Sequence, residues 1–289
     1  MSGTYGLPPQ IIDIHNHAHF PDDGAELIGV MDELHIQTAL LLGLPESIID
    51  GHGANPRMLE AVRRRPERFV GGCYLDPRRG PAAIDEMRHY HAEGLRVVKL
   101  FPNHGYYPDD EALRPFFDAV AELKMAVLSH CGWLTTADTQ VSAAYYSAPG
   151  RFEKLVRTYK ETQFILAHMG GINGLLESIM LATRAPNLFL DCSPGQGTWA
   201  LEFAGALVAS VPPEKILWGA DGLDPRAMLY RDREALEKIG FGPHFDKIFY
   251  LNARGLLERI GALPPLDIAR GGPESVEGPA TPPAAPAAG

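Results

Sequence analysis

The chain of 289 residues is poor in cysteine and contains no long apolar run. Its three cysteines are odd in number, lie far apart and form no C-x-x-C pair, which argues against a disulfide framework and favours free thiols in a reducing compartment. No stretch approaches about 18 uninterrupted apolar residues, so we expect no membrane span. The N-terminal segment MSGTYGLPPQ has no charged region followed by an apolar one. We therefore expect a cytoplasmic protein without a signal peptide.

The chain also lacks an excess of positive charge. It has 26 Lys and Arg residues against 36 Asp and Glu residues, which gives a formal net charge of −10. The densest basic cluster, RRRPER at 63–68, is interpreted as the end of a solvated helix. Because this balance provides no electrostatic footprint for nucleic acid, we expect a small-molecule substrate and neither a nucleic acid nor a membrane as partner. A homodimer is the default expectation for assembly.

Short apolar runs alternate with longer amphipathic segments along most of the chain. Strands are predicted at 11–15, 38–43, 68–75, 96–101, 126–131, 163–168, 187–192 and 215–220. This alternation implies crossover connections and a parallel sheet, and several runs are apolar on both faces, as a sheet covered by helices requires. Eight such units in about 260 residues fit an α/β fold of the (β/α)8 TIM-barrel type. A doubly wound open sheet is the alternative, disfavoured because no glycine-rich phosphate turn follows the first strand.

The last part of the chain differs in composition from the rest. From residue 271 onward it reads GGPESVEGPATPPAAPAAG, almost entirely Pro, Gly, Ala and small polar residues. Such a segment cannot bury enough apolar surface to offset the entropy of ordering. We therefore predict one barrel domain at 1–265 and a disordered tail at 266–289.

The segment IIDIHNHAHF at 11–20 is unusually rich in histidine. In a strand, His15 and His17 project to the same side, with Asp13 one step deeper on that face. On a helix the two histidines would diverge by roughly 200°. The strand therefore makes H-x-H a credible two-ligand clip, although the motif alone fits a histidine-rich polar loop equally well.

Further ligand-type residues end other predicted strands. His130 ends the fifth strand, His168 the sixth and Asp221 the eighth. The carboxyl ends of barrel strands meet at one mouth, where barrel enzymes keep their active sites. Together with His15 and His17, these residues supply imidazoles and one hard oxygen, a set that suits a divalent first-row ion. Each could singly be a satisfied polar residue, but their joint placement favours a metal site.

Lys99 ends the fourth predicted strand, where burial of a lysine without a partner is costly. It could form an ion pair with Asp13 or another acid, bind a substrate carboxylate, or be carbamylated to bridge two metals. The loop histidines His19, His52 and His104 are interpreted as surface residues near the mouth.

Several motifs resemble those of a known family when taken in order. They are DIHNH, VVKLFPNHGYYPDDEALRPFFDAVAELKMAVLSHCG, FILAHMGG, KILWGADGLDP and YLNARGLLERIG. They resemble successive motifs of the amidohydrolase superfamily, specifically its amidohydrolase-related branch of metal-dependent TIM-barrel hydrolases and non-oxidative decarboxylases. The resemblance runs from about residue 11 to residue 261, so it covers the whole predicted barrel.

The resemblance implies one divalent metal ion, zinc by default with manganese or iron as alternatives. The implied ligands are His15, His17, His130 and Asp221. His168 corresponds to a histidine that acts as an acid, base or electrostatic partner in mononuclear members and binds a second metal in binuclear ones. Lys99 occupies the place of the bridging carbamylated lysine, but a lysine there is also usual in the mononuclear branch, so we expect it to be unmodified.

We therefore predict a metal-dependent hydrolase that attacks a small, carboxylated ester, lactone or amide with metal-activated water. Asp221, His168 and Lys99 are the predicted catalytic residues. A metal-dependent non-oxidative decarboxylase is the alternative, and a ligand-binding barrel without turnover is a third interpretation. The compact chain favours a hydrolase, whereas GADGLDP departs from the branch's commoner GSDxP form, which leaves substrate contacts in that loop open.

Overall fold

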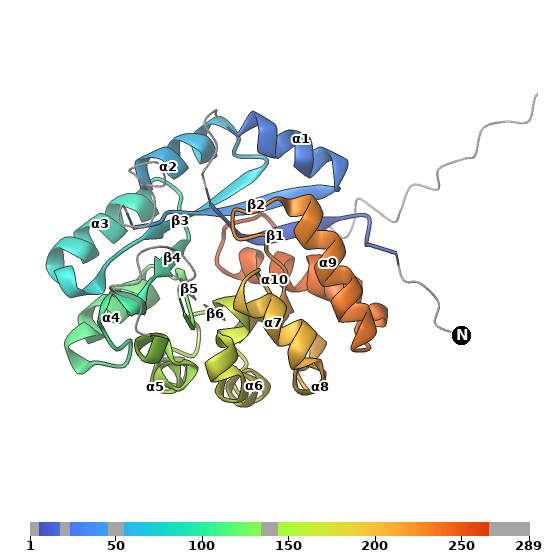
Figure 1. Ribbon diagram of the computed structural model, residues 1–289. Coiled ribbons are helices and arrows are strands. Elements are labelled where there is room, and N and C mark those ends of the chain that lie inside the picture. The colour runs from blue at the N-terminus through green and yellow to red at the C-terminus, as the bar shows by residue number, and fades with distance from the viewer. Residues whose placement is uncertain (1–5, 18–23, 46–54, 134–143, 266–289) are drawn as a thin grey trace, which may run out of the picture.

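The computed structural model describes residues 6–17, 24–45, 55–133 and 144–265. Within them, eight parallel strands pair in sequence order from β1 to β8 (Figure 1). The eight predicted strands are confirmed, and their bounds are β1 Ile11–His17, β2 Ile36–Leu42, β3 Phe69–Tyr74, β4 Val97–Leu100, β5 Ala126–Ser129, β6 Phe164–Leu166, β7 Leu188–Asp191 and β8 Ile216–Leu217.

Backbone hydrogen bonds between the first strand and the segment after the last bring the two ends of the sheet together. Ile14 N donates to Trp218 O at 3.0 Å, and Asp221 N donates to His15 O at 2.6 Å. The sheet thus curls into a ring, which confirms the expected (β/α)8 TIM barrel over the doubly wound alternative. The second of these bonds also fixes one predicted ligand beside another.

Helices surround the ring of strands (Figure 1). An apolar layer packs between their inner faces and the outer faces of the strands. The helices are α1 Ala25–Glu33, α2 Asn55–Arg64, α3 Pro81–Ala92, α4 Arg114–Glu122, α5 Glu153–Thr158, α6 Leu175–Arg184, α7 Gln196–Phe203, α8 Gly205–Val208, α9 Pro225–Lys238 and α10 Asn252–Arg259. None of the helices in the described part of the chain is long and apolar enough to cross a membrane.

The last helix, α10, closes one end of the barrel. Leu256, Leu257 and Ile260 join a second apolar cluster with the inward side chains of the strands, including Ile12 and Leu217. The Asn252 amide donates to Ile216 O at 2.8 Å, at the start of β8. The N-terminal ends of the strands are therefore plugged, and the polar strand ends lie at the opposite, open end.

The first strand contains an irregularity that aims the histidine clip. Asp13 pairs with Ala39 and Asn16 with Leu41, so three steps on β1 match two on β2. Simple alternation would put Ile14 and His15 on opposite faces. Because a β-bulge adds one residue, Ile14 joins the inner cluster while His15 also reaches the inward-facing residues of other strands.

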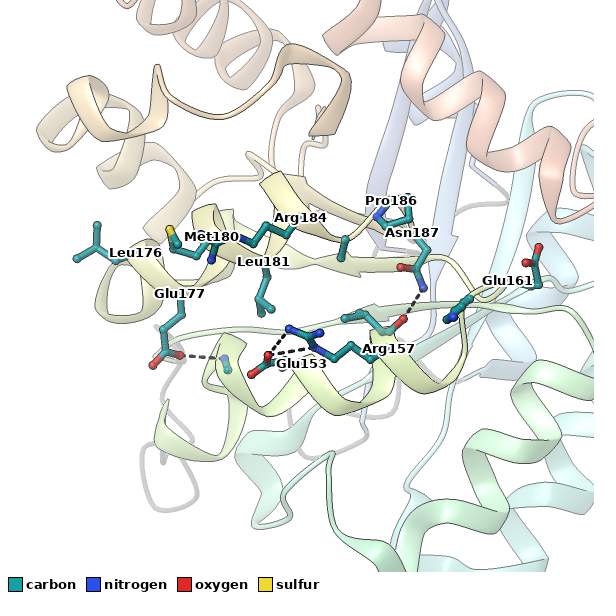
Figure 2. A pocket seen from close by; sticks show the side chains of 14 residues that line it. Glu153, Arg157, Glu161, Leu176, Glu177, Met180, Leu181, Arg184, Pro186 and Asn187 are labelled. Carbon is teal, nitrogen blue, oxygen red and sulfur yellow. Dashed lines mark hydrogen bonds and ion pairs between the residues drawn. The ribbon is translucent and has the colours of Figure 1, made fainter.

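A groove of about 1230 Å³ lies on the outer surface, between α5 and α6. Figure 2 shows Glu153 and Arg157 of α5 near Leu181 and Met180 of α6. The groove is lined by residues of these helices and of the segments that follow them, and by none of the predicted site residues. It is therefore separate from the chemistry at the strand ends.

Candidate metal centre

His15, His17 and Asp221 come together at the open end of the barrel. Asp221 Oδ1 lies 3.0 Å from His15 Nε2 and 3.1 Å from His17 Nε2. The three ligand atoms all lie within 4.8 Å of one another. The two rings meet edge to face with centroids 5.1 Å apart, so the strand does project both histidines to one side, as the sequence predicted.

The Nδ1 atoms of His15 and His17 both donate hydrogen bonds. His17 Nδ1 lies 3.1 Å from Leu42 O, and a carbonyl can only accept, so Nδ1 carries the proton. Burial lowers the pKa of His17 to about 3, which keeps the ring neutral and leaves Nε2 unprotonated. His15 Nδ1 lies 2.9 Å from Asp191 Oδ2 and donates in the same way.

The Asp221 carboxylate therefore faces the Nε2 lone pairs of His15 and His17, unless a proton or a cation lies between them. Burial and the Lys99 charge act to lower the pKa of His15, but Asp221 and Asp191 outweigh them and raise it. A positive charge on His15 or on Lys99, whose Nζ lies 2.9 Å from His15 Nε2, compensates the Asp221 carboxylate. This arrangement of imidazole nitrogens around a carboxylate oxygen could hold a divalent metal ion.

Asp221 is held in an uncommon backbone conformation. Its φ is 55°, in the left-handed region, and its amide is bonded to His15 O. Gly219 precedes it, and a Cβ at Gly219 would lie 2.6 Å from His15 Cβ, so only glycine lets the chain pass this closely. Burial raises the pKa of Asp221, but the neighbouring His15 and His168 lower it far more, so the carboxylate stays ionised. Its side chain is 26% exposed, which makes it the most solvent-accessible of the three candidate ligands.

Lys99 is buried inside the barrel and points at the same centre. Its Nζ lies 2.9 Å from His15 Nε2 and 5.1 Å from the centroid of the Phe101 ring. Burial lowers the pKa of Lys99 to about 8, so the ammonium still prevails at neutral pH. Asp13, which the sequence offered as its ion-pair partner, instead accepts from Asn16 Nδ2 at 2.7 Å and from the backbone amides of His15 and Ala220 at 3.1 Å.

His130 and His168 lie side by side but apart from the three-atom group. His168 Nε2 is 3.2 Å from His130 Nδ1, and the His168 ring centroid is 5.4 Å from that of His15. His130 stacks on Phe101 at 5.2 Å with an interplanar angle of 10°. Its Nε2 is buried without a hydrogen-bond partner among the described residues. The role of His130 as a metal ligand remains a prediction.

The turn after β6 differs from the predicted strand end and reorients His168. The sequence extended this strand to residue 168, but β6 ends at Leu166. His168 and Met169 adopt left-handed φ values of 56° and 58°. Such values are costly for residues with a Cβ, and they cluster at functional sites.

Asp191 and Ser193 belong to the site but were not predicted. Asp191 Oδ2 binds His15 Nδ1, while Oδ1 accepts from the Ser193 hydroxyl, from Ser193 N at 2.9 Å and from His168 N at 3.1 Å. Burial raises the pKa of Asp191, but His15 and these hydrogen bonds lower it below its ordinary range. The available signal was position, because Asp191 ends the seventh predicted strand as the other site residues end theirs.

Gln196, at the start of α7, ties together the loops that follow β5 and β6. Its Nε2 donates to Trp133 O at 2.7 Å, and its Oε1 accepts from Ile172 N at 3.2 Å. Gly132 has a φ of 85°, and a Cβ there would lie 2.5 Å from the Gln196 amide. The loops that carry His130 and His168 onward are thus packed against one buried side chain.

His104 forms part of an aromatic wall beyond Phe101. Its ring stacks on Phe101 at 5.9 Å, and its Nδ1 lies 3.3 Å from the Tyr74 hydroxyl. The stack His130–Phe101–His104 therefore leads outward from the site. His19 and His52 lie outside the described residues.

Comparisons with known proteins agree with this architecture. Solved structures with similar folds include a probable 2-pyrone-4,6-dicarboxylic acid hydrolase from Acinetobacter baumannii, with a TM-score of 0.62 at 17% identity over 87% of this chain and 99% of the other. A 5-carboxyvanillate decarboxylase from Sphingomonas paucimobilis gives 0.61 at 15% identity over 86% and 99%. A manganese-bound 5-carboxyvanillate decarboxylase from Novosphingobium aromaticivorans gives 0.56 at 17% identity over 83% and 82%. At these identities the likeness shows the fold.

A search of curated proteins gives no match. The sequence profile of the family described as Amidohydrolase matches residues 12–259, which include all of the strands except Ile11 and the whole site. Four of the five motifs that resembled this family in the sequence carry predicted site residues. The chain belongs to the amidohydrolase family.

Proposed function

We propose that this protein is a metal-dependent hydrolase of a small, carboxylated ester, lactone or amide. The observation that carries the proposal is the convergence of His15 Nε2, His17 Nε2 and Asp221 Oδ1. In each of the two histidines Nδ1 already donates a hydrogen bond, so Nε2 presents a lone pair beside the Asp221 carboxylate. A group of two such nitrogens and one carboxylate oxygen favours the binding of a cation.

The residues present fit one divalent ion. His15, His17 and Asp221 would hold it, and His130, whose buried Nε2 has no partner within the described residues, is the proposed fourth ligand. When bound, such an ion supplies Lewis acidity, which lowers the pKa of water and polarises a carbonyl. Zinc is the default for this nitrogen-rich set, and manganese or iron is the alternative.

The chain's own groups divide the remaining work. Asp221 is ionised and partly open to solvent, so it can accept a proton from attacking water. His168 is buried next to His130, and once the bond between the two rings opens, its Nε2 can accept or return a proton near the leaving group. Lys99 brings a buried ammonium to the same centre and would attract an anionic substrate group. Phe101 and its stacked neighbours wall one side.

A non-oxidative decarboxylase is the second candidate. It is supported by the fold similarity to two proteins described as 5-carboxyvanillate decarboxylases, one of them with manganese bound. The same groups would then serve differently: Lys99 and the cation would hold the carboxylate, and a protonated His168 or Asp221 would deliver a proton to carbon.

The test is one substrate panel read in two ways. The purified full chain is analysed for metal content, stripped with a chelator and reloaded with zinc or manganese. Carboxylated lactones, esters and aromatic acids are then assayed for both ring or ester opening and carbon dioxide release. We expect about one metal per chain and metal-dependent opening. Carbon dioxide release without opening would select the decarboxylase, and a chain that takes up no metal and turns over no substrate would refute both enzymes.

A further inference from the structure

Asp191 is the hub of a buried hydrogen-bond network behind the metal ligands. One of its oxygens holds His15, and the other accepts from the Ser193 hydroxyl. Asp191 and Ser193 are fully buried, so no solvent competes for these bonds. Its Oδ1 also accepts from the backbone N–H groups of Ser193 and His168, which can only donate, so this oxygen carries no proton and the Ser193 hydroxyl must donate to it.

Ser193 has a single hydroxyl proton, which it uses in a hydrogen bond to Asp191 Oδ1. The same Ser193 oxygen lies 2.9 Å from His168 Nδ1. Because its one proton points at Asp191, the hydroxyl can only accept a hydrogen bond from His168, so His168 Nδ1 must be protonated. Because its hydroxyl donates to Asp191, Ser193 presents its oxygen to His168 Nδ1 as a hydrogen-bond acceptor.

The consequence passes through His168 to His130. Both rings are buried, where a charged ring would be costly, so each is neutral and carries one ring proton. With Nδ1 protonated, His168 Nε2 must accept from His130 Nδ1, 3.2 Å away. His130 Nε2 is then left without a proton, and it is the buried nitrogen that lacks a partner among the described residues.

We propose that Ser193 is a positioning residue that fixes His168 in the Nδ1-protonated tautomer and, through His168, leaves His130 Nε2 free to bind metal. The proposal rests on the proposed metal site for its last step. Its first step, the tautomer of His168, concerns the chain alone. Removal of a hydrogen-bond partner that orients a metal ligand typically changes metal affinity by about 10–100-fold.

The test compares Ser193→Ala with two matched variants of the full-length protein. Ser178→Ala removes an equally buried hydroxyl that bonds the Met169 carbonyl behind the same turn, and Ser193→Thr keeps the hydroxyl. Two-bond proton–nitrogen correlation spectra, recorded with and without zinc, report which ring nitrogen of His168 is protonated. Zinc affinity is measured by competition with a chelating dye, and circular dichroism checks folding.

We expect wild type, Ser178→Ala and Ser193→Thr to show His168 protonated at Nδ1. Ser193→Ala should shift the proton toward Nε2 and weaken zinc binding by about 10–100-fold. An unchanged tautomer or an unchanged zinc affinity in Ser193→Ala overturns the proposal. If Ser193→Ala does not fold, Ser193→Cys, with a weakly hydrogen-bonding thiol, takes its place. If wild type itself binds neither zinc, manganese nor iron, the proposed function fails, and the metal-free spectra alone decide the tautomer.

Discussion

Asp221 and Asp224 stand three residues apart in one loop and provide a matched comparison at the residue scale. Asp221 faces both histidines of the clip, whereas Asp224 caps α9 by accepting from Arg226 N at 3.0 Å. We predict that Asp221→Asn lowers kcat/KM by about 10²–10⁴-fold, because the proton acceptor is lost. Asp224→Asn should retain activity, since Asn is also a good N-cap. Steady-state kinetics at saturating metal check this, and an Asp221→Asn enzyme within tenfold of wild type would contradict it.

Lys99 permits a second prediction about a single side chain. Lys99→Met keeps a long apolar stem in a fully buried place while removing the ammonium. For a carboxylated substrate we expect KM to rise about 10–100-fold, the usual effect of losing a hydrogen bond to a charged group. The methyl ester of the same substrate should be affected much less. Paired kinetics on the acid and the ester provide the measurement, and an equal loss on both would show that Lys99 acts on the centre and not on the substrate charge.

At the scale of single residues, the sequence reveals the candidate metal ligands better than the side chains that hold them in place. His15, His17 and Asp221 could be predicted because the ends of parallel strands converge, and the structure brings them together. Ser193 could not be predicted, because a serine after a strand carries no mark of its partner. Its role depends on a tautomer that only the placement of Asp191 and His168 determines.

At the scale of elements, β1 shows where sequence patterns stop short. The period of two identifies the strand, but it cannot place Ile14 and His15 both toward the interior. The β-bulge that does so depends on pairing with β2, a contact between separate segments of the chain. The same holds for the turn at His168, since its left-handed backbone follows from packing and not from local propensity.

The loop junction at Gln196 gives a prediction at this scale. Gly132 and Gly94 have similar φ values of 85° and 95°, but a Cβ at Gly94 would meet no atom within 4 Å, whereas one at Gly132 would collide with Gln196. Gly94→Ala should therefore cost only the backbone strain, about 1–2 kcal/mol. Gly132→Ala should cost more and also lower activity. Urea denaturation with parallel activity assays tests this. Equal losses of unfolding free energy and activity in the two variants would mean that the loops at Gln196 rearrange without cost and would contradict the prediction.

At the scale of the whole molecule, stability should depend on pH through Asp232. This residue lies on the buried face of α9, where Trp218 Nε1 donates to it at 3.1 Å. Burial raises the pKa of Asp232 from 3.8 to about 6, although Arg231 opposes the shift. Between these pH values the folded state binds more protons than the unfolded state, so this residue's contribution to stability falls as pH rises from about 4 to 6.

We predict that Asp232→Asn removes this dependence. The free energy of unfolding of the variant, relative to wild type, should increase by about 1–3 kcal/mol between pH 4 and pH 7. Urea titrations at several pH values give the difference, in which the titrations of all other groups cancel. A difference that stays constant with pH would show that folding leaves the pKa of Asp232 at its ordinary value.

The closed end of the barrel has a practical consequence. The helix α10 plugs the end of the barrel opposite the carboxyl ends of the strands, and Leu263 packs against the same interior cluster. The described chain therefore leaves the barrel on the face away from the site. A solid support, reporter or carrier enzyme joined on this C-terminal side would stand behind the barrel, clear of the substrate's route. Immobilised in that orientation, the protein could present its open mouth to flowing solution.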